Sequence, residues 1–250
     1  MSDMTLILAV AGFAFLLAGL VKGVLGQGLP TVAVGLLSLI MSPGEAAALI
    51  VIPALLTNLW QGWFGPSFVP LIRRLWLTLL ASFVGTFVAT WLGLGLLTPE
   101  AAALARKALG IALMFYGILG VSQIRLQVPP RAEPWHGPVM GAANGAMSTA
   151  TGVFMFPVIP YIQALGMQRD DLVQAQGVSF SVSSLALMIV VFANGTLTAA
   201  NATASLVAML VAFVGMFAGQ HVRNLVHPNV FRTLFFLGML VLGVHLAFIR

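Results

Sequence analysis

Gly19-Leu20-Val21-Lys22-Gly23-Val24-Leu25-Gly26-Gln27-Gly28-Leu29-Pro30-Thr31 lies between two apolar runs, yet it cannot itself form an uninterrupted helix. Three glycines and one proline fall within residues 23–30, and both residue types weaken or break helices. An unpaired backbone N–H or C=O group in hydrocarbon costs several kcal/mol, so a break inside a membrane survives only where protein or a watery cavity satisfies the freed groups. We therefore predict that something binds at this break.

The composition places the break in a membrane. The 250 residues are 60% hydrophobic and 7% charged, with a mean hydropathy of +1.05, which leaves too little polar surface for a soluble core of this size. The sequence predicts an all-α polytopic membrane protein with one transmembrane domain, residues 1–250, in contact with the lipid bilayer. The net charge of +5 sits at span ends, so no nucleic-acid partner is expected.

A second small and polar stretch, Gly141-Ala142-Ala143-Asn144-Gly145-Ala146-Met147-Ser148-Thr149-Ala150-Thr151-Gly152, opens the second half of the chain. Interrupted helices at corresponding places in two halves are the best sequence pointer to a transporter's substrate site. We predict that this stretch is also broken or re-entrant, and that the two breaks meet inside the bilayer around one hydrated site.

The apolar runs divide evenly between the two halves. They cover residues 5–21, 30–41, 45–64, 72–96, 101–121, 137–147, 153–166, 172–193, 198–220 and 229–249. The proline-containing linker 126–136 separates a first repeat, residues 1–125, from a second, residues 137–250. Five segments per half is an odd number, which predicts two inverted repeats.

An eight-span alternative counts each broken pair of runs as one crossing. Residues 5–41 as one helix would be about 55 Å long, roughly twice the hydrocarbon thickness, so one crossing cannot absorb them. The short run 30–41 is instead expected to form half of a re-entrant hairpin.

Charge also favours the ten-segment arrangement. It collects Arg73, Arg74, Arg125, Arg131, Arg169, Arg223 and Arg232 on one side with Lys22 near them, and leaves Arg106, Lys107 and Arg250 on the other. The positive-inside rule then makes the first side cytoplasmic and both termini extracytoplasmic, in the inner (plasma) membrane.

Two groups of residues have structural interpretations. Glu45, Asp170 and Asp171 each open a helix, where capping is their expected role. The pairs Gly19/Gly23 and Gly141/Gly145 have the spacing of small residues that let helices pack closely.

Several motifs follow one another over nearly the whole chain. They are Gly19, Gly23, Gly26 and Gly28; Ser42-Pro43 with Glu45-Ala46-Ala47; Thr57-Asn58 with Gln61; Ala150-Thr151-Gly152-Val153-Phe154; and Gln163-Ala164-Leu165-Gly166 with Gln174-Ala175-Gln176-Gly177. In this order the chain resembles the TauE/SafE family, also called TSUP, of sulfite and organosulfonate exporters. The resemblance implies export of small anionic sulfur compounds. The chain departs from the family's commoner second-half glycine cluster at Ser148, Thr149 and Ala150.

The candidate site combines polar groups of both breaks with polar residues of the spans that follow them. A helix that starts at Pro30-Thr31 presents N–H groups that attract anions, and nothing acidic lies in either break to repel one. The residues predicted to bind the substrate are Lys22, Gly26, Gln27, Gly28, Thr31, Asn58, Gln61, Asn144, Ser148, Thr149, Thr151, Gln176 and Ser179.

Lys22 has two interpretations. A helix dipole contributes roughly 0.3–2 kcal/mol, whereas burying a bare ion in a medium of low dielectric constant costs tens. The site must therefore stay hydrated from one side at a time or include a full positive charge, and Lys22 is the basic residue placed to supply one. Alternatively, Lys22 snorkels to the cytoplasmic interface from the end of the first span.

We expect a secondary transporter that exports a small sulfur-containing anion such as sulfite, sulfoacetate or a related organosulfonate by alternating access. A passive anion channel, or a carrier for another small carboxylate or oxyanion, is the alternative. Absent cysteine excludes thiolate metal sites, and the four histidines are isolated, so we expect no metal, no cofactor and no enzymatic activity. A homodimer is a partner arrangement that the sequence leaves open.

Overall fold

The computed structural model of the chain describes residues 2–95, 97–98, 100–122, 126–223, 225 and 228–249. These residues form helices and connecting segments, with no strand among them. The helices are α1 (Ser2–Leu25), α2 (Leu29–Leu37), α3 (Pro43–Trp63), α4 (Phe68–Trp91), α5 (Ala102–Ser122), α6 (Glu133–Thr151), α7 (Val158–Ala164), α8 (Arg169–Ala193), α9 (Ala199–Val222) and α10 (Pro228–Val244). A 3-10 turn (Pro130–Ala132) precedes α6, and a π-helical turn (His245–Ile249) follows α10.

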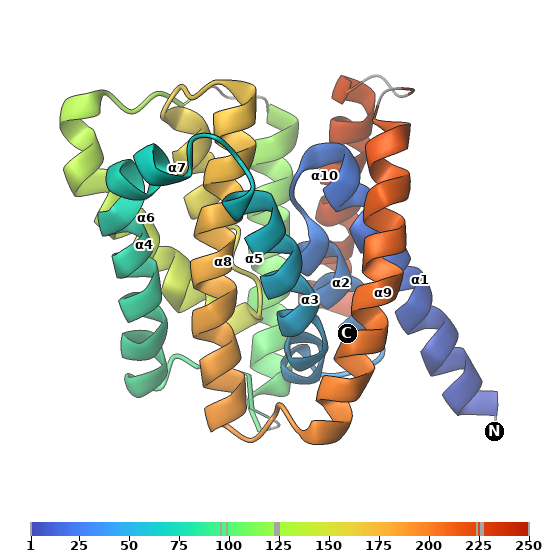
Figure 1. Ribbon diagram of the computed structural model, residues 1–250. Coiled ribbons are helices and arrows are strands. Elements are labelled where there is room, and N and C mark those ends of the chain that lie inside the picture. The colour runs from blue at the N-terminus through green and yellow to red at the C-terminus, as the bar shows by residue number, and fades with distance from the viewer. Residues whose placement is uncertain are drawn as a thin grey trace.

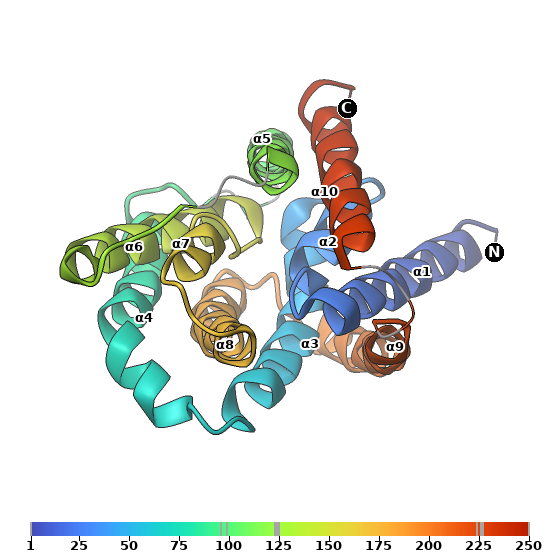
Figure 2. The same cartoon turned by 90° about the horizontal axis from the view of Figure 1, so that it is seen from above.

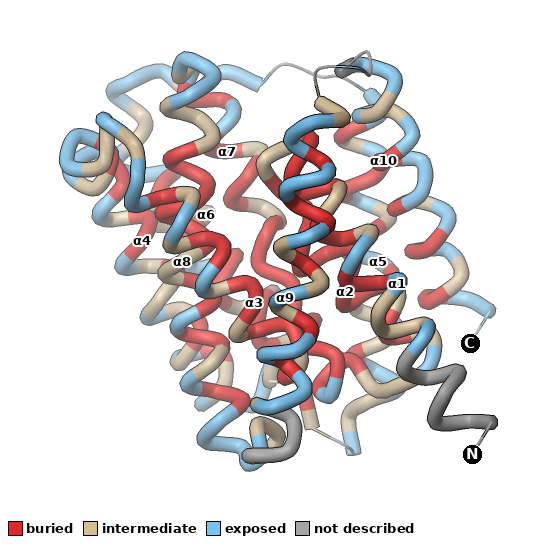
Figure 3. Tube along the Cα trace, turned by 45° about the vertical axis from the view of Figure 1, so that its right-hand side comes forward, coloured by how far each residue is buried: buried red, intermediate tan, exposed pale blue. Residues whose placement is uncertain are grey.

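Six helices in the described part of the chain are long and apolar enough to cross a membrane: Pro43–Trp63, Phe68–Trp91, Ala102–Ser122, Arg169–Ala193, Ala202–Val222 and Asn229–Ile249. The apolar part of α1, Ala9–Leu25, is slightly shorter. The prediction of an all-α polytopic membrane protein is thereby confirmed. The most apolar stretches of α8 and α3 are 67% and 56% buried, more than those of the other four, so these two helices are central to the fold (Figure 3).

The helices α2 and α7 are half-helices. Nine and seven residues give lengths of about 14 Å and 10 Å, well short of the roughly 30 Å hydrocarbon core. Each follows a break and leads the chain into the next long helix (Figure 1). The expectation of a short re-entrant segment after the first break is therefore confirmed, and the second half contains its counterpart.

The first break is shorter than the glycine pattern indicates. The helix α1 continues through Gly19 and Gly23 to Leu25, and only residues 26–28 are irregular. Gly26 has φ 75° and Gly28 has φ 103°, a left-handed conformation that side chains disfavour. Pro30 then occupies the first turn of α2, where its missing N–H is not needed.

The second break was predicted in the wrong place. Residues 141–151 are helical within α6, and the irregular segment runs from Gly152 to Pro157. The small residues face α4: a Cβ on Gly145 would lie 2.5 Å from both Ser82 O and Thr86 N. Their small size serves close packing and not a break. The hydroxyl of Thr151 accepts from the N–H of Val153 (3.2 Å) beside the helix end.

The predicted packing role of both glycine pairs is confirmed. A Cβ on Gly19 or Gly23 would overlap the backbone of α9 at Ala212 and Met216, as one on Gly141 or Gly145 would overlap α4. The same kind of contact thus joins α1 to α9 and α4 to α6.

Corresponding helices of the two halves each pack on a helix of the opposite half. The helix α1 packs on α9 while α6 packs on α4, and α3 packs on α9 while α8 packs on α4. Seen from above, α4, α6, α7 and α8 gather on one side of the molecule, and α1, α2, α3 and α9 on the other (Figure 2). This pattern of packing supports an inverted relation of the halves, which stays a prediction, as does the division at residues 125 and 137.

Positive charge gathers at one end of the molecule. The helices α3, α5, α7 and α9 end at the upper end of the molecule in Figure 1, and α4 and α8 end at the lower end. The arginines near the upper end are Arg73, Arg74, Arg131, Arg169, Arg223 and Arg232, whereas Arg106 and Lys107 lie near the start of α5 at the lower end. This is the grouping that the ten-segment arrangement predicts. Arg125 and Arg250 lie outside the described residues.

Glu45 caps α3, as predicted. The hydroxyl of Ser42 accepts from Glu45 N (3.2 Å), and the Glu45 carboxylate accepts from Ser42 N (2.8 Å), which together form a capping box. Asp170 and Asp171 lie in the first turn of α8, where the helix dipole favours acidic residues.

Candidate functional site

Lys22 lies in the last turn of α1 and is buried, with 3% of its surface exposed. Its Nζ donates a hydrogen bond to Oδ1 of Asn58, a fully buried residue on α3. The side chain therefore points between helices and does not reach the interface. The snorkelling interpretation is wrong here, because Asn58 offers Lys22 a buried acceptor that the sequence alone could not place.

The pair of Lys22 and Asn58 has a further donor without a partner. The Nδ2 group of Asn58 is buried and has no hydrogen-bond partner. Among the residues that the structure describes, the one ion pair joins Arg74 to Glu133 (2.6 Å), so Lys22 has no carboxylate partner there. Burying a charge or a polar group without a partner is costly. Lys22 and Asn58 thus present unmatched donors that suit an anionic ligand.

The first break continues directly from Lys22. Gln27 is buried, and its Oε1 has no partner. The next helix, α2, starts after Gly28 without a side-chain cap, and its first residues Leu29 and Thr31 are fully buried. An uncapped, buried helix N-terminus adds favourable potential for an anion.

The second break lies against α2, the helix that follows the first break, while direct contact of the two breaks around one site stays a prediction. The hydroxyl of Thr31 in α2 donates to the sulfur of Met155 in the second break. A Cβ on Gly152 would lie 2.9 Å from Ala47 Cβ and 3.7 Å from a methyl group of Val34. The second break is therefore packed along α2 and the start of α3.

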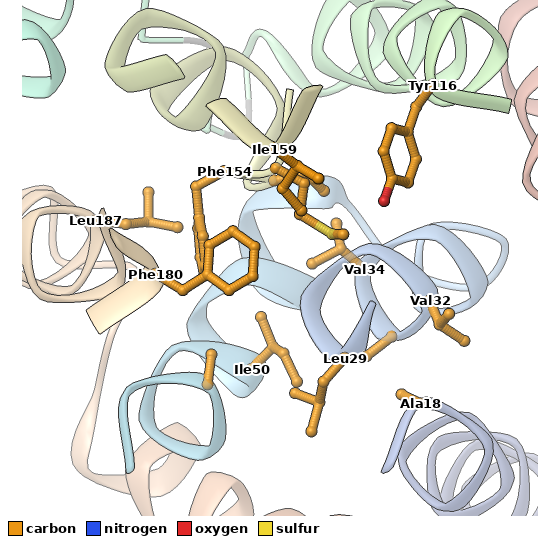
Figure 4. Packing of buried hydrophobic residues seen from close by; sticks show 14 of the residues in the cluster. Ala18, Leu29, Val32, Val34, Ile50, Tyr116, Phe154, Ile159, Phe180 and Leu187 are labelled. Atoms are coloured by element: carbon orange, nitrogen blue, oxygen red, sulfur yellow. The ribbon is translucent and has the colours of Figure 1, made fainter. Parts of the chain in front are cut away.

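The space where the second break meets α2 is small and mostly apolar. A cavity of about 10 Å³, room for a single water molecule, is lined by Thr31, Ala112, Leu113, Tyr116, Met147, Val153, Met155 and Phe156. Apolar packing closes the adjoining region, where Phe154 contacts Phe180 at a ring distance of 5.8 Å (Figure 4). The expected polar pocket between the breaks is absent from this part of the structure, because Met155 and Val153 occupy it.

Tyr116 is a candidate that the sequence analysis missed. It lies in α5 and lines this cavity, and its buried hydroxyl has no hydrogen-bond partner. Figure 4 shows the hydroxyl directed toward α2. The available signal was a tyrosine in the middle of an apolar run, since a buried tyrosine hydroxyl usually finds a partner.

Asn144 forms a separate polar cluster with two serines between α4, α6 and α8. Asn144 Nδ2 donates to Ser82 Oγ (3.0 Å) and to Ser183 Oγ (3.1 Å), and these two hydroxyls lie 3.1 Å apart. The hydroxyls of Ser148 and Ser179 are buried without partners. Within the described part of the chain, no hydrogen bond joins this cluster to Lys22 or Asn58.

Two further candidates bond within their own helix, a third bonds to a neighbouring helix, and a fourth is buried. Thr149 donates to Ala146 O (3.1 Å) and Thr151 to Met147 O (2.7 Å), both within α6. Gln61 Nε2 donates to Val173 O (2.8 Å), which ties the end of α3 to the start of α8. Gln176 is buried on α8. These contacts neither assign nor exclude a role in binding, which stays a prediction for all thirteen residues.

Both half-helices have their C-terminal ends held by an arginine. Arg106 Nε and Nη2 donate to Ser38 O and Met41 O, each at 3.2 Å, just beyond α2. Arg74 Nη2 donates to Leu165 O (3.2 Å), the residue that ends α7. A cation at a helix C-terminus also complements the helix dipole.

Replacing Arg106 by methionine is expected to destabilise the protein, because the carbonyl groups beyond α2 lose their charged donor. A hydrogen bond to a charged group contributes about 1.5–3 kcal/mol, so a fall of several degrees in the melting temperature is expected in detergent. Lys107→Met, at the exposed next position, is the matched control. Equal melting temperatures for the two variants would contradict the role of Arg106.

One comparison with known proteins gives a match. The family model described as Sulfite exporter TauE/SafE matches residues 11–246, nearly the whole chain. No curated protein and no solved structure matches the chain.

Proposed function

Because the chain belongs to the sulfite exporter TauE/SafE family, we propose that it is a secondary transporter that exports a small sulfur oxyanion, such as sulfite, sulfoacetate or a related organosulfonate, by alternating access. The multi-pass helical fold and the family support a membrane transporter and not an enzyme. The choice of anion and the mechanism are the proposed parts.

The observation that carries the proposal is the buried pair of Lys22 and Asn58. Its free donors, the remaining Nζ protons and Asn58 Nδ2, can hydrogen-bond oxyanion oxygens while the ammonium charge offsets the desolvation of the anion. The N-terminus of α2 adds a smaller favourable potential from the same side of the break.

The packing where the second break meets α2 supports a carrier over a channel. A channel needs a continuous polar path, whereas the cavity there holds about 10 Å³ and is lined mainly by apolar groups. Passage of an anion through this region requires that α2 and the segment after Gly152 separate. Alternating movement of the two helix groups in Figure 2 would provide that separation.

The distribution of charge gives the proposed orientation. The arginine-rich upper end of Figure 1 faces the cytoplasm of the inner membrane, and both termini are extracytoplasmic. Lys22, in the last turn of α1, then lies in the half of the protein nearer the cytoplasm, from which an exported anion enters.

Counterflow in proteoliposomes tests the proposal. Vesicles preloaded with unlabelled sulfite are expected to accumulate external labelled sulfite transiently, because a carrier exchanges the two across one site. Saturable counterflow that sulfoacetate inhibits would support a sulfur oxyanion carrier. Conductance without counterflow would identify a channel, and counterflow of small carboxylates alone would identify a different substrate class.

A further inference from the structure

Lys22 is a buried amine whose described partner is neutral. Its Nζ bonds to an amide oxygen, and no carboxylate in the described residues pairs with it. An ammonium ion in such surroundings costs several kcal/mol, and buried groups commonly neutralise instead. A bound oxyanion removes this cost, because the two opposite charges then share one site. The site therefore has two stable states. In one, the Lys22 amine is neutral and no anion is bound; in the other, Lys22 is protonated and paired with a bound anion.

Among the described residues, no charged side chain on the helices around Lys22 supplies the negative charge that a bound anion would supply. The elements concerned are α2 and α9, which pack on α1; α3, which bears Asn58; and α8 and α10, whose Val173 and Phe235 lie beside Gly26 and Gly28. The helix α2 carries no titratable side chain. We next consider the described titratable residues of α3, and those of α8, α9 and α10 that are nearest in sequence to the contacts just named. They are Glu45, Arg169, Asp170, Asp171, His221 and Arg232.

Each of these residues is either bonded to a group other than Lys22 or exposed to solvent. Glu45 is engaged in the capping box of α3, and Asp171 accepts a hydrogen bond from Ser67 Oγ (2.6 Å). His221 is exposed and bonds to Phe217 O on its own helix (2.9 Å). Arg169 and Asp170 are exposed, and Arg232 lies over the ring of Phe236. None forms an ion pair with Lys22.

We propose that anion binding loads one proton onto Lys22, so that the carrier moves the anion and a proton together. This inference rests on the proposed function and assigns its coupling ion. The step is balanced: the Nζ lone pair takes a proton from water on the open side, and the ammonium pairs with the anion. On the other side the anion leaves, and the ammonium returns its proton to water and becomes a neutral amine again. Asn58 Oδ1 accepts from the amine in either state and holds it in place.

Coupling fixes how transport responds to gradients. A monovalent anion that travels with a proton carries no net charge, so the membrane potential does not drive it. Export then depends on the outward gradient of the anion itself, and an acidic exterior opposes it. An alkaline interior imposed on vesicles would instead draw the anion inward.

Titration calorimetry of the purified protein with methanesulfonate tests the coupling, because this probe stays a monoanion throughout the accessible pH range. Measurements at one alkaline pH in buffers of different protonation enthalpy are expected to report uptake of about one proton per bound anion. The affinity is expected to fall up to about tenfold for each unit of rising pH. Lys22→Arg keeps a permanent positive charge, so it should bind with no proton uptake and little pH dependence.

A flux measurement on the unmodified protein provides an independent test. Proteoliposomes with an alkaline interior are expected to accumulate methanesulfonate above its external concentration, and a proton-conducting ionophore should abolish the accumulation. Binding without proton uptake, together with flux that ignores the pH gradient, would overturn the coupling and leave the exporter proposal standing. Failure of methanesulfonate, sulfite and sulfoacetate to bind at any pH would overturn both.

Discussion

Lys22→Met is expected to weaken the binding of sulfur oxyanions at least about hundredfold, which corresponds to about 2.7 kcal/mol. The variant removes the charge that offsets desolvation of the anion, and losing one member of a buried charged pair commonly costs 2–5 kcal/mol or more. Binding by calorimetry and flux in proteoliposomes should both fall. Lys107→Met, at an exposed position of α5, should bind as the unmodified protein does.

Stability separates a binding role from a folding role. Lys22→Met leaves Asn58 Oδ1 without its donor, so a loss of about 1–3 kcal/mol is expected. Replacing both partners, as Lys22→Met with Asn58→Leu, removes the unsatisfied groups and should recover much of that stability without recovering binding. Unchanged affinity in the stable double variant would show that the pair does not bind the anion.

Gly23→Ala is expected to destabilise the fold strongly, whereas Gly12→Ala on the same helix is not. A Cβ on Gly23 would overlap the backbone of Met216 and lie 2.9 Å from the Cα of Gly219, so α1 and α9 must separate. Overpacking typically costs about 1–3 kcal/mol, and rigid backbone on the opposing helix favours the upper part of that range.

Gly12 is the matched control because no atom lies within 4 Å of a Cβ placed on it. Alanine also favours a helix by about 1 kcal/mol over glycine, so Gly12→Ala should be neutral or mildly stabilising. Melting temperatures and the monodisperse yield after purification compare the two variants. Equal behaviour would mean that α1 and α9 do not pack as closely as described.

Much of the fold could be predicted because apolar runs and helix breakers are local signals. The run 45–64 became α3 and opens with the capping box of Ser42 and Glu45, both readable from sequence. The position of the second break could not be predicted, because glycine serves both tight packing and chain reversal. Gly145 serves tight packing because the backbone of α4 lies directly against it. The sequence could not show this, since α4 is distant from Gly145 along the chain.

The candidate site was predictable in residue type and less so in arrangement. A lysine beside a broken helix indicated Lys22, but only the position of α3 shows that Asn58 holds it away from the interface. Asn144 was expected at the same site and instead bonds to Ser82 and Ser183, because α4 and α8 flank α6. The unpartnered hydroxyl of Tyr116 emerges only once α5 is placed beside the second break.

We expect a sulfur oxyanion to bind at the buried Lys22 amine at the end of α1. Crystals grown with selenite, the selenium counterpart of sulfite, would locate the ligand by its anomalous scattering. We predict a peak within hydrogen-bonding distance of Lys22 Nζ and Asn58 Nδ2. A well-occupied peak elsewhere in the membrane-spanning part, with none at Lys22, would contradict this account.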